Sequence, residues 1–409
     1  MRRIPGVASL LALMIGPAVL GGCVGEWVSA GVLRSAAESA GDPAAKAGVE
    51  ATLRSLEAAC LAGDADAFMA LIDRTDEEFV HEQLYFARDL AKKKPEAIAL
   101  VVGDLRVEGA EAVGPMTWTW TMPGGRERTV SFEARFVARE GTWLYAGETW
   151  ERHEAPGVVV LHDPGLGELA ARTVEAFVAV RGDVEKIFGH DRGTLAGSEL
   201  PGKTQKIKLY GSMRHLQQSI CLSYVDGLAG WNEPHESVKL LASRRSGLNE
   251  LKSLLAHEYG HVATFIMGPT STRMPWWALE GVAEYASRVV MNSAGPNARV
   301  ERWARRGELA PWDAIADFET YERRFGAHVY TQGHHMVQYI TTRAGDEARN
   351  RWLRAMSNGS TLDDATREAL GVSFAELDAA WRATLPAAEK ADEKVEEKAG
   401  DQPPASAGS

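Results

Sequence analysis

The chain has 409 residues, of which 45% are hydrophobic and 25% are charged. This balance excludes a chain that is disordered overall and allows two or three buried cores. Acidic residues outnumber basic ones by 56 to 45, for a net charge of −11, and no stretch gathers basic residues as a nucleic-acid site would. We therefore expect no nucleic-acid partner.

The first 22 residues have the features of a secretion signal. Two arginines precede an apolar run over 7–20 that is too short to span a membrane. The run ends in Leu-Gly-Gly-Cys at 20–23, which resembles the lipobox of bacterial lipoproteins. This resemblance implies cleavage before Cys23, a lipid on its thiol, and a protein anchored to a membrane of the bacterial cell envelope with its domains outside the cytoplasm. The alternative is an ordinary signal peptide with an incidental cysteine.

A small and polar tether over 23–46 leads to a first domain that we place at 47–153. Apolar residues at helical spacing predict helices over 49–72 and 77–93. Alternation of apolar and polar residues then predicts an antiparallel sheet. Helices followed by a curled antiparallel sheet make an α+β unit, and this one resembles the nuclear-transport-factor-2-like cone fold. The expected strands cover 116–122, 130–136 and 143–146.

A second domain is expected over 156–385, because the composition changes near Pro156. Its first half mixes helix and strand, with a helix over 167–188 and a strand over 206–210, and its second half is all helical. The tail over 386–409 is too polar to bury a core, so we expect it to be disordered.

Besides Cys23 the chain has two cysteines, Cys60 and Cys221. Two cysteines in a chain of this length make no disulfide framework, and Cys60 falls on the apolar face of a predicted helix, so we expect buried thiols. They cannot supply a cysteine-rich metal cage. Any metal site therefore has to be built from histidine and glutamate.

The clearest chemical signal in the chain is His257-Glu258-Tyr259-Gly260-His261. Apolar residues around it recur at three- and four-residue steps, which predicts a helix packed into a core. Two histidines four apart on a helix lie on one face, so both imidazoles can reach one metal ion. Burying them together with Glu258 would be costly unless they are paired or bind metal. Gly260 weakens the helix, and its expected use is the close approach of another backbone.

A second helix is predicted to begin near Pro275 and to carry Glu280 and, one turn later on the same face, Glu284. Glu280 follows the His-Glu-x-x-His motif after eighteen intervening residues. This spacing, together with the sequence WWALEGVAEY over 276–285, resembles the gluzincin metallopeptidases of the MA clan, in particular the bacterial peptidase MA-like family.

The resemblance implies a two-lobed, thermolysin-like peptidase domain whose C-terminal half is helical. It implies that His257, His261 and Glu280 bind one Zn²⁺ per chain and that Glu258 is the general base. Three protein ligands and one open position are also what catalytic zinc requires. By the same resemblance Glu284 holds a ligand histidine in its tautomer, and the alternative for Glu284 is a solvent-facing helix carboxylate.

Two further features narrow the class of peptidase. The metzincin pattern requires glycine at 264 and histidine at 267, where this chain has Thr264 and Met267, so that class is excluded. Tyr330 and Gly333, at the predicted start of a helix, resemble the Tyr-x-x-Gly element of gluzincin aminopeptidases, which implies that the Tyr330 hydroxyl stabilises the oxyanion; a core aromatic is the alternative. The Gly-x-Met-Glu-Asn signature of those aminopeptidases is absent from the sequence, which favours an endopeptidase.

A strand over 237–241, just ahead of the motif helix, is predicted either as an exposed edge along which a peptide could lie or as an interior strand. Core or surface positions are expected for four other histidines, with a place in the cleft as the alternative for one of them, so they are left out of the site. They are His235, His328, His334 and His335.

These features predict a lipid-anchored zinc metallopeptidase, an endopeptidase acting on peptide or protein substrates. The alternative is a non-catalytic binding or scaffold lipoprotein that keeps the peptidase fold. The intact Glu258 favours hydrolysis, because a merely structural metal site does not need that carboxylate.

Overall fold

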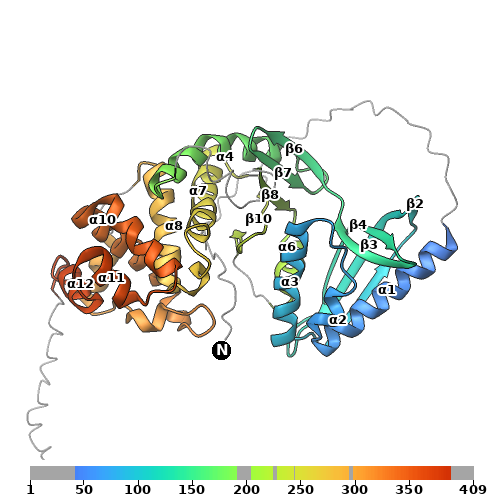
Figure 1. Cartoon of the computed structure of the whole chain (residues 1–409), viewed down its shortest axis with the longest axis horizontal. Helices are drawn as coiled ribbons and strands as arrows, with labels where there is room; N and C mark the ends of the chain where they lie inside the picture. Colours follow the sequence, from blue (N-terminus) through green and yellow to red (C-terminus); the bar gives the residue numbers. More distant parts are fainter. Residues whose placement is uncertain (1–41, 191–203, 224–227, 244, 294–297, 388–409) are drawn as a thin grey trace, which may run out of the picture.

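The computed structural model describes residues 42–190, 204–223, 228–243, 245–293 and 298–387. The predicted signal sequence, Cys23 and most of the predicted tether and tail lie outside the described residues. Within the described ranges, no helix is both long and apolar enough to cross a membrane. The chain is mixed α+β, with the C-terminal helices at one end, one sheet at the other end and a second sheet between them (Figure 1).

The N-terminal part, residues 43–148, packs helices against a five-stranded antiparallel sheet. Its elements are α1 (Pro43–Ala62), α2 (Ala65–Met69), α3 (Glu77–Lys92), β1 (Ala97–Val102), β2 (Arg106–Glu108), β3 (Glu111–Thr121), β4 (Arg128–Arg139) and β5 (Thr142–Glu148). The strand order is β1-β3-β4-β5, with β2 paired to β3. A single helix over 49–72 is wrong, because Gly63 ends α1 in a left-handed conformation (φ 68°) and Asp64 caps α2.

The predicted alternation of β3 is confirmed. Met116, Trp118 and Trp120 are at most 1% exposed and lie in one core with α1 and α3. Thr117 and Thr119 lie on the opposite face, where their hydroxyls form hydrogen bonds of 2.9 and 3.1 Å with side chains of β4. One face of this sheet is therefore apolar and buried and the other is polar, because successive side chains of a strand point to opposite faces.

Cys60 and Cys221 are free and buried, which confirms the prediction of two separate thiols. Burial raises the pKa of each thiol to about 12, with the charges of Glu57 and Asp89 acting in the same direction. Neither thiol is therefore a nucleophile at neutral pH.

The C-terminal part, residues 151–387, begins with a second five-stranded sheet in the order β6-β7-β8-β10-β9. Its elements are β6 (Glu151–Ala155), β7 (Val158–His162), α4 (Gly167–Ile187), β8 (Gln205–Tyr210), α6 (Met213–Ile220), β9 (Gly230–Trp231) and β10 (Val238–Leu241). Because β6 pairs with β7, this sheet starts at Glu151, ahead of the predicted boundary near Pro156. The strand expected over 237–241 is interior, since β10 lies between β8 and β9.

Helices complete the chain. They are α7 (Leu248–Phe265), α8 (Trp276–Val290), α9 (Ala298–Arg306), α10 (Gly326–Ser357), α11 (Leu362–Leu370) and α12 (Phe374–Arg382), with short 3-10 turns at Ser271–Arg273, Trp312–Ile315 and Arg323–Phe325. The predicted helices around the His-Glu-x-x-His motif and after Pro275 are confirmed as α7 and α8. The expected helix start at Tyr330 is wrong, because α10 begins at Gly326 and places Tyr330 one turn inside.

Glycines let α7, α8 and α10 cross closely. A Cβ atom on Gly260 would lie 3.2 Å from the Cα atom of Ala283, which confirms the predicted close approach of a second backbone to α7. On the other side of α8, a Cβ atom on Gly281 would lie 2.5 Å from the carbonyl carbon of Gly333. Any side chain at Gly281 would therefore push α10 away from the helix that carries Glu280.

Candidate metal centre

Two consecutive helices bring three metal-ligating side chains together. The Nε2 atoms of His257 and His261, both on α7, are 3.2 Å apart. The Oε2 atom of Glu280, on α8, lies 3.2 Å from Nε2 of His257 and 3.4 Å from Nε2 of His261. All three side chains are 0% exposed, and together they form a group that could hold a metal ion.

The shape of this group fits zinc. Ligand atoms placed tetrahedrally about a zinc ion at 2.0–2.1 Å are about 3.3 to 3.4 Å from one another. The three measured distances lie at or just below that value. Glu280 also has a buried oxygen, Oε2, with no hydrogen-bond partner among the described residues, while its Oε1 accepts a hydrogen bond of 2.9 Å from Nε1 of Trp276. Burying a carboxylate oxygen without a partner costs free energy of folding, and a cation between this oxygen and the two imidazoles would supply the missing partner.

Glu284 lies behind the group rather than in solvent. Its Oε2 atom is 3.6 Å from Nδ1 of His257, and its Oε1 atom accepts a hydrogen bond of 2.8 Å from Nε of Arg288. Burial alone would raise the pKa of Glu284, but the adjacent His257 imidazole, followed by Arg288, lowers it to about 2. A carboxylate at Nδ1 orients the ring so that Nε2 faces the other two ligands.

Negative charge exceeds positive charge around His257. Burial by itself lowers the pKa of this imidazole, yet the carboxylates of Glu280 and Glu284 at its ring nitrogens and the charge of Glu258 raise it to about 10. Three carboxylates therefore converge on one pair of imidazoles. An environment that stabilises positive charge to this degree suits a divalent cation.

Glu258 lies on the same helix turn, and β9 passes directly over it. A Cβ atom on Gly230 would lie 2.6 Å from Cδ of Glu258, so only glycine leaves room for this carboxylate. The neighbouring Asn232 donates a hydrogen bond of 3.0 Å from Nδ2 to the backbone oxygen of Glu258. Sequence reasoning missed Gly230 and Asn232, because the contact depends on how the strand crosses the helix and no local pattern reports it.

Tyr330 lies beside the group. Its ring centroid is 6.3 Å from that of His257 and 6.2 Å from that of Trp276, and its hydroxyl is buried. The four histidines that the sequence placed outside the site pack elsewhere. His328 stacks on Trp303, His335 accepts a hydrogen bond from Trp381, His235 lies against His81, and His334 is buried near Tyr285.

A second cluster of potential ligands, Glu148, Asp163 and His215, has a different character. Oε2 of Glu148 lies 2.6 Å from Nε2 of His215, and Oδ2 of Asp163 lies 3.2 Å from Nδ1. Each carboxylate faces a different ring nitrogen, so both nitrogens of His215 already have an acidic partner. Burial lowers the pKa of His215, but the two carboxylates outweigh it and raise the pKa to about 10. We read this cluster as an imidazolium held between two carboxylates.

No family model and no curated protein matches this sequence. Native yeast LTA4 hydrolase is similar over 72% of this chain and 46% of its own length, with 12% identity and a TM-score of 0.35, so the chain spans about half of that protein. A function-unknown protein from Mycobacterium tuberculosis is similar over 25% of this chain and 68% of its own, with 14% identity and a TM-score of 0.20. A putative calcium/calmodulin-dependent protein kinase II association domain from Xanthomonas campestris is similar over 29% of this chain and 92% of its own, with 20% identity and a TM-score of 0.19.

Proposed function

We propose that this protein is a zinc-dependent metallopeptidase that hydrolyses internal peptide bonds, anchored to a membrane of the bacterial cell envelope by a lipid on Cys23. Three buried ligand atoms at mutual distances of 3.2 to 3.4 Å carry the proposal. Glu258 follows His257 on α7, and the ring centroid of Tyr330 lies 6.3 Å from that of His257, so a general base and an oxyanion donor are both near the three ligands. Among the described residues the group has three ligands, whereas a structural zinc site has a fourth protein ligand.

Each residue has a defined role in the proposed reaction. His257, His261 and Glu280 hold the ion, which when bound lowers the pKa of water and polarises the scissile carbonyl. Glu258 accepts the proton of the attacking water and returns it to the leaving amine. Tyr330 donates a hydrogen bond to the oxyanion that forms at the carbonyl.

The substrate of this proposal is an extended peptide that pairs with β9. In the described part of the chain β9 pairs only with β10, so it is an edge strand of this sheet. Peptides commonly add to such an edge through main-chain hydrogen bonds. Because Gly230 of β9 lies against Glu258, a peptide paired there has its backbone next to the general base.

The direct test compares Glu258→Gln with the wild-type protein on a broad peptide library. We expect the variant to keep about one zinc per chain and to lose cleavage by at least about 10². Glu175→Gln is the matched control, since Glu175 is exposed on α4. Zinc binding by the wild type without any cleavage above the Glu258→Gln level would refute hydrolysis and leave the scaffold alternative.

A further inference from the structure

The strand over Glu258 is attached to the N-terminal part on both of its sides. Ahead of β9, α6 and the residues after it dock on the first sheet. Leu222 is 2% exposed and belongs to the core of the N-terminal part, and Nε1 of Trp120 donates a hydrogen bond of 3.3 Å to its backbone oxygen. His215 of α6 lies stacked on Phe132 of β4, with ring centroids 5.2 Å apart, and is paired with Glu148 of β5.

Behind β9, the segment over residues 232–237 docks on α3. The hydroxyl of Tyr85 donates a hydrogen bond of 3.3 Å to the backbone oxygen of Pro234. The hydroxyl of Ser237 donates a hydrogen bond to Oε1 of Glu82. The rings of His81 and His235 lie 5.2 Å apart. One face of α3 therefore holds the connection that leads from β9 into β10.

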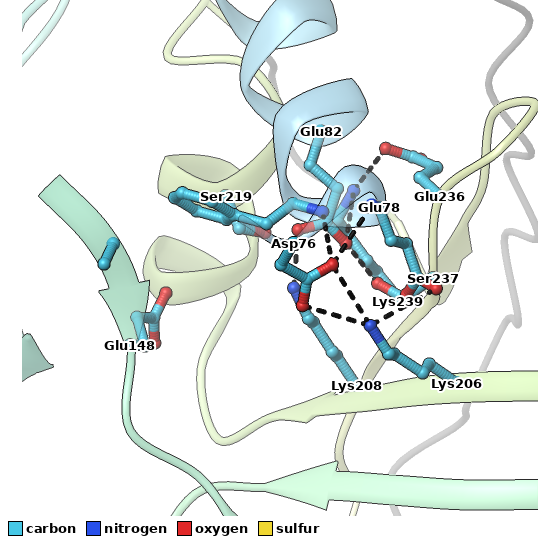
Figure 2. Close-up of polar contacts among 12 residues, drawn as sticks. Asp76, Glu78, Glu82, Glu148, Lys206, Lys208, Ser219, Glu236, Ser237 and Lys239 are labelled. Atoms are coloured by element: carbon cyan, nitrogen blue, oxygen red, sulfur yellow. Dashed lines mark hydrogen bonds and ion pairs between the residues drawn. The ribbon is translucent and has the colours of Figure 1, made fainter. Parts of the chain in front are cut away.

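Glu82 is the centre of this contact, as Figure 2 shows. Besides Ser237, it meets Lys208 of β8 at 2.5 Å and Lys239 of β10 at 3.8 Å. Lys239 is 1% exposed and also pairs with Glu236 at 2.6 Å. Burial alone would raise the pKa of Glu82, but the two lysines lower it to about 2. Oε1 of Glu236 has no hydrogen-bond partner among the described residues, but the ion pairs that Glu82 and Lys239 make hold these segments in one arrangement.

We propose that the N-terminal part is a built-in clamp that holds β9 over Glu258, with Glu82 as its central positioning residue. The inference rests on the proposed function, because the catalytic consequence requires hydrolysis at Glu258. Gly230 leaves no spare space above that carboxylate. A shift of β9 by about 1 Å therefore moves both the substrate edge and the general base, which can reduce turnover by about 10².

Three variants of the full, zinc-loaded chain test the clamp. Glu82→Gln removes the central charge, Tyr85→Phe removes only the hydrogen bond to Pro234, and Glu77→Gln changes an exposed residue of the same helix. The first readout is amide hydrogen exchange over residues 228–241, which needs no substrate. We expect exchange there to be at least about tenfold faster in Glu82→Gln, clearly faster in Tyr85→Phe, and unchanged in Glu77→Gln.

The second readout is peptide cleavage. We expect kcat/KM to fall at least about tenfold in Glu82→Gln, with zinc content and the visible spectrum of the cobalt-substituted protein unchanged. If Glu82→Gln and Tyr85→Phe both exchange at the wild-type rate over residues 228–241, the clamp is refuted. If exchange is faster in Glu82→Gln but cleavage is unaltered, the positioning role of Glu82 is refuted. Should Glu82→Gln fail to fold, Tyr85→Phe decides. A wild type without cleavage would refute the proposed function alone, because the exchange readout still decides the clamp.

Discussion

Substitution of Gly230 by alanine separates catalysis from stability. The new Cβ atom would lie 2.6 Å from Cδ of Glu258 and closer still to its Oε1 atom, where ordinary contact needs about 3.4 Å, so the carboxylate has to move by at least about 0.8 Å. The atoms that give way are the far end of a flexible side chain, so we expect the free energy of unfolding to change by less than about 1 kcal/mol. A misplacement of that size at a general base costs on the order of 10² in kcat, which corresponds to about 2.7 kcal/mol in the barrier.

The assay measures kcat and KM on a cleaved peptide, the zinc content and the melting temperature of Gly230→Ala. Gly167→Ala is the matched control, because a Cβ atom at the start of α4 meets its nearest neighbour, His153, at an ordinary 3.5 Å. We expect full zinc content, a near-wild-type melting temperature and a large loss of kcat in Gly230→Ala alone. Wild-type kcat in this variant would show that Glu258 is not the base that the site uses.

The other predictions concern the surroundings of the site and the clamp. Glu284→Gln should weaken zinc affinity by about 10- to 100-fold, measured by competition with a chelator, because His257 loses the carboxylate at Nδ1; unchanged affinity would contradict the role of Glu284. Tyr330→Phe should lower kcat by about 10² to 10³ with little change in KM, and an unaffected kcat would leave Tyr330 as a core aromatic. The pKa of Glu82 is lowered to about 2 from 4.5, so its contribution to stability is present above pH 4.5 and is lost as the pH falls toward 2. Chemical denaturation between those pH values should therefore show a weaker pH dependence in Glu82→Gln than in wild type, and identical profiles would contradict the pairing.

Residues on consecutive helices could be placed from the sequence. His257 and His261 share a helix face by their spacing, and the helix that follows carries Glu280 and Glu284 one turn apart. Because one short connection joins α7 to α8, the helical period and a tight turn suffice to predict that these side chains meet. The close approach at Gly260 followed from the same reasoning.

Contacts between distant segments could not be predicted in this way. Gly230 meets Glu258 only because β9 ends a sheet that lies against α7, and neither the strand order nor this crossing has a local signature. Glu82 looks like one of several acids on the polar side of an amphipathic helix, although it is 4% exposed between two lysines of the other sheet. A glycine followed by a capping aspartate does indicate in the sequence that α1 ends at Gly63. Apolar residues recur at helical spacing on both sides of this pair, however, and that pattern favoured one continuous helix.

Anomalous diffraction at the zinc absorption edge, from crystals of the zinc-loaded protein, tests the central claim most directly. We predict one peak per chain, at about 2.0 to 2.1 Å from Nε2 of His257, Nε2 of His261 and Oε2 of Glu280. A peak at the cluster of Glu148, Asp163 and His215, or no peak between α7 and α8, would contradict the metal centre and the hydrolytic function built on it.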